Sequence, residues 1–341
     1  MARMSDLGND LYTGKKSFNI VGRWKLWFGI AIVLILISVI GPFLRGGFVF
    51  GIEFRGGSQF SITQVADQSQ QLGIDAVKSV DPSVVPAVTT LGQNGVRIQT
   101  DQLSDAESSQ VQDALAAAYN VAPTDVTYNF IGPTWGADIT GQAIRGLLIF
   151  LALAAIFMAI YFRTWKMAAA AMIALLHDLV ITAGIYGITG FEITPAAVIG
   201  FLTILGYSLY DTVVVFDKIR ENTRQMGEKP TRTFSETVNL AVNQTLVRSL
   251  NTSVVAMLPV ASILFIGAFV LGAGTLRDIS LALLIGIFVG TYSTIFIASP
   301  MYALFRSSEQ KIKKQDARVL AVRAQNAAVA DTAAQNESIS A

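Results

Sequence analysis

The sequence predicts a multi-pass α-helical membrane protein with six transmembrane helices and one small external α+β domain between helices 1 and 2. Hydrophobic residues make up 52% of the chain and charged residues only 14%, whereas soluble domains carry about 25% charged residues. Six apolar segments reach the length of about 20 residues that is needed to cross hydrocarbon. Polar residues gather between the first two segments, which predicts a folded domain outside the bilayer.

The first apolar segment covers residues 24–44 and follows a polar, basic segment, residues 1–23. A signal peptide is the alternative interpretation of this start. Its apolar core would hold about 7–15 residues and end at small residues. The segment is longer than that and ends in Pro42-Phe43-Leu44-Arg45, so we expect a membrane anchor that stays in the protein.

Residues 45–137 carry nine acidic and four basic residues and read as a small α+β domain. Short β-branched or alternating runs predict strands, at residues 48–54, 59–62, 84–90, 96–100 and 125–131. One helix is predicted at 104–119, because Ser104 and Glu107 match a capping box and apolar residues follow at helical spacing. A weaker helix is expected at 66–72. This mixture predicts a sheet with helices on one side.

Five more apolar segments complete the six spans, at residues 139–162, 167–189, 194–216, 252–271 and 276–305. We therefore expect transmembrane helices 2–6 within residues 138–305, with one longer, partly helical cytoplasmic loop at 217–251. The tail, residues 306–341, is first basic and then rich in Ala, Asn, Gln and Ser. Such a composition predicts disorder.

The basic residues orient the chain, because cytoplasmic segments of membrane proteins carry an excess of Lys and Arg. Placing both termini and the loop 217–251 on one side collects most of the 25 basic residues there. We therefore expect cytoplasmic N- and C-termini and an external domain.

Composition excludes several kinds of function. The chain has no cysteine, and His177 is its single histidine, so thiol chemistry and a histidine-rich metal site are excluded. No glycine-rich nucleotide-binding loop occurs, and a net charge of +1 argues against nucleic acid as a partner. We expect no catalytic residues, no cofactor and no metal, and we predict that the protein is not an enzyme.

Asp211 lies inside the fourth apolar segment. A carboxylate at a helix centre costs roughly 2.5–3.5 kcal/mol to insert, and a proton or a nearby cation relieves that cost. Tyr207 and Ser208 lie one turn earlier and could hydrogen-bond to Asp211. Arg248, at the start of the fifth segment, is the candidate cation. The alternative is an interfacial carboxylate and an ordinary snorkelling arginine.

His177 and Asp178 lie midway through the third segment. A buried structural pair and a proton path explain them equally well. In the sixth segment, Gly286-x-x-x-Gly290 predicts close packing against another helix.

Three of these segments resemble a known family. Gly51-Ile-Glu-Phe-Arg-Gly-Gly57, after a first transmembrane helix, looks like the signature of the SecD/SecF family of protein translocase subunits. Residues 206–222 and 244–253 are similar to the fourth-helix motif and the start of the fifth helix in its SecF branch. The resemblance covers about residues 20–305. The six-helix length favours the SecF branch over SecD, which has a much larger external domain.

The resemblance implies an auxiliary subunit of the Sec translocase in the bacterial plasma (inner) membrane, from the resistance-nodulation-division superfamily of proton-driven machines. It implies a heterodimer with SecD, contact with the SecY-containing channel, the exported unfolded polypeptide and membrane lipids, and a ferredoxin-like external domain. The pair is expected to use the proton motive force to promote export.

The resemblance also implies roles for particular residues. The family's membrane aspartate maps to Asp211 and its arginine to Arg248. The expected proton relay comprises Asp211, Arg248, Ser208, Tyr207, His177 and Asp178. The family motif in the external domain comprises Gly51, Glu53, Gly56 and Gly57. Two positions depart from the family: Glu53 stands where Asp is usual, and Tyr210 where Asn commonly precedes the aspartate.

Two other functions stay open. One is half of a proton-driven small-molecule or lipid exporter of the same superfamily, which would usually have a much larger external region than residues 45–137. The other is a passive translocon scaffold that moves no protons.

Overall fold

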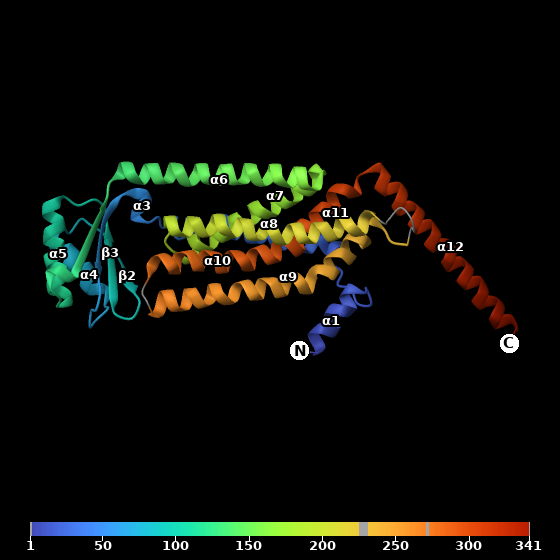
Figure 1. The fold of residues 1–341 in the computed structure, drawn as a ribbon, viewed down its shortest axis with the longest axis horizontal. Coiled ribbons are helices and arrows are strands. Elements are labelled where there is room, and N and C mark those ends of the chain that lie inside the picture. The colour runs from blue at the N-terminus through green and yellow to red at the C-terminus, as the bar shows by residue number, and fades with distance from the viewer. Residues whose placement is uncertain (1, 225–230, 271–272, 341) are drawn as a thin grey trace.

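Six helical segments, each long and apolar enough to cross a membrane, form an elongated bundle with a small α/β domain at one end (Figure 1). The structure is a computed structural model and describes residues 2–224, 231–270 and 273–340. The segments are Val21–Leu44, Pro133–Phe162, Trp165–Thr189, Pro195–Arg224, Phe234–Phe265 and Gly274–Ser307. The predicted fold class is confirmed.

The membrane helices are named in chain order. They are α2 (Trp24–Leu44), α6 (Pro133–Phe162), α7 (Trp165–Thr189), α8 (Pro195–Arg224) and α9 (Phe234–Phe265). The sixth span consists of α10 (Gly274–Ser293), the π-helical turn η5 (Thr294–Ala298) and α11 (Ser299–Ser307), and a second π-helical turn, Ile266–Val270, follows α9.

The expected loop 217–251 is mostly helix in its described part. The helix α8 continues to Arg224, and α9 begins at Phe234. Thr233 and Glu236 form a capping box that fixes the start of α9. Residues 225–230 of the expected loop lie outside the described residues.

Both ends of the chain carry further helices. The helix α1 (Ala2–Tyr12) precedes a segment held on α9, where the side chain of Asn243 accepts a 2.7 Å hydrogen bond from the N–H of Phe18. At the other end, α12 (Gln310–Ser340) projects from the bundle (Figure 1). The composition of the tail predicts disorder, whereas the structure gives helix here, in keeping with the high helix propensity of alanine.

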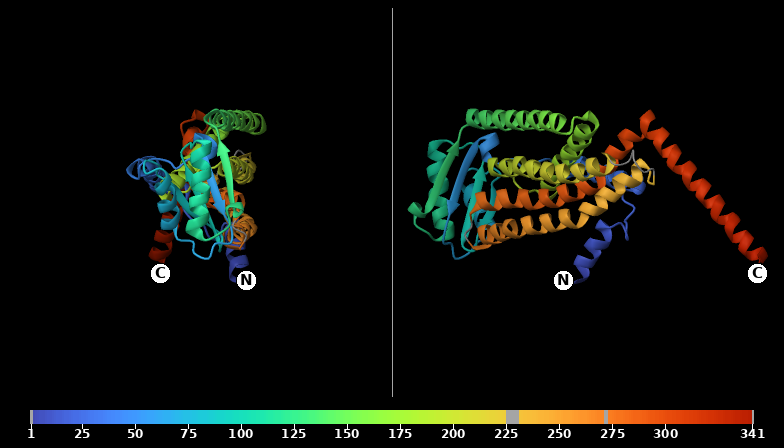
Figure 2. Two further views of the ribbon diagram at one scale, coloured as in Figure 1. Left: turned by 90° about the vertical axis from the view of Figure 1, so that its left-hand side faces the viewer. Right: turned by 45° about the vertical axis from the view of Figure 1, so that its right-hand side comes forward.

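The α/β domain contains a four-stranded antiparallel sheet in the order β2-β3-β1-β4. Its strands are β1 (Gly57–Ile62), β2 (Ala87–Leu91), β3 (Gly95–Thr100) and β4 (Val126–Ile131). With α4 (Gln70–Val80) after β1 and α5 (Asp105–Tyr119) after β3, the chain order is β-α-β-β-α-β, the ferredoxin-like arrangement. The helices cover the face of the sheet that points away from the bundle (Figures 1 and 2).

Alternation along the strands builds the core of this domain. Phe60 and Ile62 of β1 lie opposite Ile98 and Val96 of β3, and all four are fully buried. The predicted capping box at Ser104 and Glu107 is confirmed.

Two predictions inside the domain are wrong in detail. Residues 48–54 form no strand, but an isolated bridge at Phe50 followed by the short helix α3 (Ile52–Arg55). Glycines at positions 47 and 51 flank the short apolar run that was expected to form a strand. The residue that pairs with Phe50 is Ile193, which lies between two membrane helices. The helix expected at 66–72 begins at Gln70 and ends at Val80.

The helix α8 lies at the centre of the bundle, packed against α7, α9 and α10. Gly286 and Gly290 of α10 lie against Ile204 and Ser208 of α8, and a Cβ atom at Gly286 would overlap Ile204. Small residues let two helices approach closely. The predicted small-residue contact face thus brings α10 next to the part of α8 that carries the site.

Candidate functional site

Asp211 lies on α8 with only 4% of its surface exposed. Its Oδ1 atom accepts a 2.8 Å hydrogen bond from Oγ of Ser249 on α9. Its Oδ2 atom is buried and has no partner among the residues that the structure describes. A buried carboxyl group needs either a donor or a proton to offset its desolvation, so the unpartnered oxygen leaves a position for a proton.

A second buried carboxyl group, that of Asp178 on α7, also bonds to α8. Its Oδ2 atom accepts a 2.6 Å hydrogen bond from Oγ of Ser208, and its Oδ1 atom lies 3.2 Å from Nδ1 of His177. Within the described ranges, Nε2 of His177 is buried without a partner. The sequence predicted a hydrogen bond from Ser208 to Asp211, but Ser208 bonds to Asp178 instead. Within one turn, α8 therefore carries Asp211 itself and the hydroxyl group that binds Asp178.

Tyr207 also bonds elsewhere than predicted. Its hydroxyl group lies 3.5 Å from Oγ of Ser253 on α9. The same Ser253 oxygen accepts a 2.6 Å hydrogen bond from Oγ1 of Thr291 on α10. Ser253 therefore connects three helices, one turn away from Ser249.

Arg248 is exposed on α9, and no ion pair joins it to Asp211 in the described chain. Arg248 therefore acts on Asp211 only by long-range electrostatic attraction, without a direct contact. Successive helical residues point about 100° apart, so the rotation that turns Ser249 toward Asp211 turns Arg248 away. Tyr210, next to Asp211, is 58% exposed on the outside of α8.

Sequence reasoning did not identify Ser249, although the sequence contained a signal. Thr245, Ser249 and Ser253 recur every four residues on α9 and are all buried. Residues at this spacing share one helix face, and small hydroxyl side chains on an apolar helix are typical of a contact with another helix.

The motif at residues 51–57 lies where the α/β domain meets the membrane helices. The N–H of Gly51 donates to the carbonyl oxygen of Ile193 at 3.0 Å, and the N–H of Ile193 donates to that of Val49 at 2.8 Å. Because Ile193 lies between α7 and α8, the backbone itself ties the domain to the α7–α8 loop.

The two glycines at the end of the motif turn the chain from α3 into β1. Gly56 and Gly57 have φ angles of +80° and +140°, a region that favours glycine. A Cβ atom at Gly57 would also overlap the carbonyl oxygen of Thr100 on the neighbouring strand. This turn therefore holds Glu53 at the junction.

Glu53 shares this junction with Glu192 and Arg97. Nη1 of Arg97 lies 3.9 Å from Oε2 of Glu192. One oxygen of each glutamate and Nε of Arg97 are buried without a partner among the described residues. Burial raises the pKa of Glu53, and the charge of Glu192 raises it further, while Arg97 opposes the effect. Glu53 therefore holds its proton more tightly than a solvent-exposed glutamate does.

The described residues contain no group of three or more His, Asp or Glu side chains placed to hold a metal ion. The site consists instead of carboxyl, hydroxyl and imidazole groups that link neighbouring helices.

Residues 110–308 match the family described as "Protein export membrane protein SecD/SecF, C-terminal". The chain belongs to the SecD/SecF family. It is 43% identical to the protein translocase subunit SecF of Streptomyces coelicolor, over 98% of this chain and 88% of that relative. It is 40% identical to SecF of Mycobacterium tuberculosis, over 91% of this chain and 72% of the relative.

A solved structure of the SecD/SecF family has the same fold. The crystal structure of SecDF from Thermus thermophilus, described as a translocon-associated membrane protein, matches with a TM-score of 0.73 and 28% identity. The match covers 86% of this chain and 39% of that one. This chain thus spans less than half of SecDF.

Replacing Ser249 with alanine should destabilise the bundle, because Asp211 then loses the hydrogen bond to its Oδ1 atom. An unsatisfied buried acceptor costs about 1–3 kcal/mol, and we expect the free energy of unfolding to fall by that amount. Thermal unfolding of the purified protein measures the change. Ser262→Ala is the control, since Ser262 is exposed and bonds within the same helix. Equal stability of the two variants would contradict this role of Ser249.

The raised pKa of Glu53 gives the junction a pH dependence. The folded state binds this proton more tightly than the unfolded state, whose pKa lies near the ordinary glutamate value of 4.5. The stabilisation is therefore complete below that pH and is lost as pH rises through the higher folded pKa. The hydrogen-exchange protection of residues 48–55, taken relative to the intrinsic exchange rate at each pH, should fall over this range in the wild type.

Glu53→Gln should remove most of that pH dependence, because its side chain stays neutral. The control is Glu107→Gln. Glu107 caps α5, and hydrogen bonds from Ser104 lower the pKa of its carboxyl group. If the protection of residues 48–55 changed with pH in the same way in the wild type and in Glu53→Gln, this role of Glu53 would be ruled out.

Proposed function

We propose that this chain is an auxiliary subunit of the Sec protein translocase that, with SecD, uses the proton motive force to promote protein export across the plasma membrane. It carries out no covalent chemistry in this proposal. Its membership of the SecD/SecF family supports the export role. One observation supports the use of protons: the buried carboxyl group of Asp211, bonded through one oxygen and unpartnered at the other.

Protonation of Asp211 changes what α8 can bond to. As a carboxylate, the group accepts the hydrogen bond from Ser249 strongly, because charged hydrogen bonds are about twice as strong as neutral ones. As a neutral acid, it has an additional donor that needs an acceptor. Each state therefore favours its own arrangement of α8 against α9.

The second bonded group extends this change to α7. Ser208 lies one turn from Asp211 and bonds to Asp178, so a movement of α8 also strains or releases that hydrogen bond. His177 beside Asp178 is a further group able to accept or donate a proton. In this proposal Asp178 and His177 respond to the position of α8, and Arg248 acts on Asp211 by its charge alone.

The α7–α8 loop carries the movement to the α/β domain. Ile193 in this loop forms backbone hydrogen bonds with Val49 and Gly51, and Glu192 beside it faces Arg97 of the sheet. A shift of α7 against α8 thus moves the domain without any flexible segment between them.

The partner supplies the remaining half of the machine. Six helices are one half of a twelve-helix parallel repeat, and SecDF contains more than this chain covers. We assign the second half to SecD. The SecY-containing channel and the emerging unfolded polypeptide are the other partners in this proposal.

The orientation follows the basic residues, with both termini in the cytoplasm and the α/β domain outside. A proton that crosses the membrane gains about 2.3 kcal/mol per 100 mV. Several protons per cycle would supply enough free energy to move the domain and the polypeptide that it holds.

The test is Asp211→Asn in membrane vesicles that contain the chain, its partner and the translocase. We expect normal assembly but loss of the part of export that depends on the proton gradient. Asp217→Asn is the matched control. Asp217 lies on the same helix, but its carboxylate accepts a hydrogen bond from the hydroxyl group of Tyr161 at the protein surface. If gradient-dependent export survived in Asp211→Asn, the proton-driven role would be contradicted, and the passive translocon scaffold would be the remaining function.

A further inference from the structure

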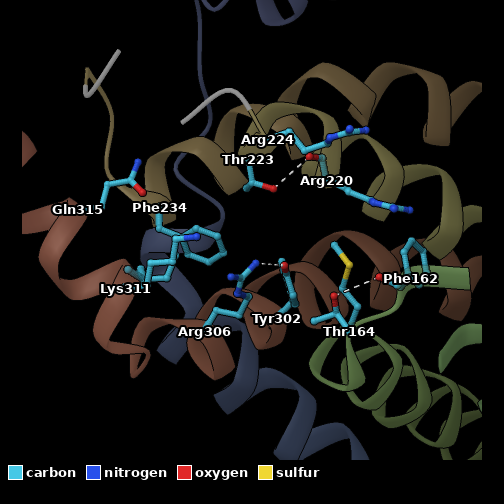
Figure 3. A pocket seen from close by; sticks show the side chains of 12 residues that line it. Phe162, Thr164, Arg220, Thr223, Arg224, Phe234, Tyr302, Arg306, Lys311 and Gln315 are labelled. Carbon is cyan, nitrogen blue, oxygen red and sulfur yellow. Dashed lines mark hydrogen bonds between the residues drawn. The ribbon is translucent and has the colours of Figure 1, made fainter. Parts of the chain in front are cut away.

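A basic cavity lies at the end of the bundle opposite the α/β domain. It has a volume of about 330 Å³ and lies between the α6–α7 turn, the end of α8, the start of α9, α11 and α12. Figure 3 shows α8 residues along one side of the cavity and residues of α11 and α12 along the other. None of the groups proposed above for proton transfer lines it.

Four basic side chains line this cavity: Arg220, Arg224, Arg306 and Lys311. Arg306 is already engaged, since Nη1 donates to the hydroxyl group of Tyr302 at 2.9 Å and Nη2 to Glu309 at 3.0 Å. For Arg220, Arg224 and Lys311 the described residues provide no side-chain hydrogen bond or ion pair. Three of the four basic side chains therefore line the cavity without a hydrogen bond or ion pair among the described residues.

The acidic groups near the cavity have other partners. Glu309 binds Arg306 and also lies 3.1 Å from Nζ of Lys166, and these hydrogen bonds hold its pKa below the usual range. Oδ1 of Asp316 accepts a 2.8 Å hydrogen bond from the N–H of Phe234. Neither carboxylate is available to neutralise the three free charges.

One part of the cavity wall is apolar, while Thr164, Thr223, Tyr302 and Gln315 add polar groups to the remainder. Phe162, Met167, Phe234 and Ile312 contribute the apolar part, and Phe162 and Ile312 are buried. Trp165, on the turn beside the cavity, is 71% exposed. Exposed tryptophan at a helix end is typical of the headgroup region.

We propose that this cavity binds a phosphate-bearing anion, with the headgroup of an anionic phospholipid as its ligand. Guanidinium groups bind phosphate oxygens in pairs, and Arg220 and Arg224, one turn apart on α8, are placed to do so. The apolar wall takes the glycerol and the first part of the acyl chains. A bound headgroup contacts both the end of α8 and α12, since both elements line the cavity.

The chemistry alone does not separate a lipid phosphate from free inorganic phosphate, so the experiment includes both. The purified full chain is reconstituted in phosphatidylcholine nanodiscs with increasing phosphatidylglycerol, and the bound phosphatidylglycerol is counted by native mass spectrometry. A parallel series receives inorganic phosphate at matched concentrations. Thermal unfolding is recorded for every sample.

We expect one tightly held phosphatidylglycerol whose binding weakens about tenfold or more in Arg220→Gln/Arg224→Gln, since basic groups near a membrane surface attract anionic lipids. The control is Lys313→Gln/Lys314→Gln, which removes two exposed charges from α12 outside the cavity and should leave binding unchanged. Arg224→Gln alone changes only an exposed side chain, so it reports on binding even if the double variant folds poorly.

Two results would overturn the proposal. Equal phosphatidylglycerol binding by the cavity variants and the control would show that the headgroup binds elsewhere. Inorganic phosphate that binds and stabilises as well as phosphatidylglycerol would show a site for the free ion and not for a lipid.

Discussion

The hydrogen bond between Asp211 and Ser249 lies in an apolar interior, where polar contacts are strong and unpaired charges are costly. A carboxyl group in such a place has few stable arrangements: it must find a donor, take up a proton, or pull its helix toward a partner. The close approach of α10 at Gly286 and Gly290 leaves α8 little freedom to relieve the burial by tilting outward. In the proposed mechanism, the protonation of this side chain and the packing of the central helix are therefore coupled.

In this proposal the α/β domain follows that coupling, because backbone hydrogen bonds and the partly buried charges of Arg97 and Glu192 attach it to the α7–α8 loop. The bridge at Phe50 and Ile193 makes the α7–α8 loop part of the domain's structure. The turn at Gly56 and Gly57 then leads the chain from α3 into β1. The proposed coupling needs such a direct connection, since a flexible linker would absorb the movement.

The sequence predicted what depends on local pattern. Segment length and hydropathy located the six spans, and Ser104 with Glu107 located the start of α5 to the residue. It failed where contacts between residues far apart in the sequence determine the structure. The rotation of α9 about its axis places Ser249 inside and Arg248 outside, and no spacing rule fixes that rotation. Residues 48–54 pair with Ile193 from another part of the chain, and Ser208 bonds to α7 because of how α7 and α8 pack.

The most direct test of the account is the protonation of Asp211 itself. Infrared difference spectroscopy of the chain with its partner in vesicles detects the carbonyl band of a protonated carboxyl group. We predict that acidifying the external side makes a band appear in the wild type that is absent from Asp211→Asn and retained in Asp217→Asn. Identical difference spectra for the wild type and Asp211→Asn at every pH would show that Asp211 does not titrate, and would contradict the account.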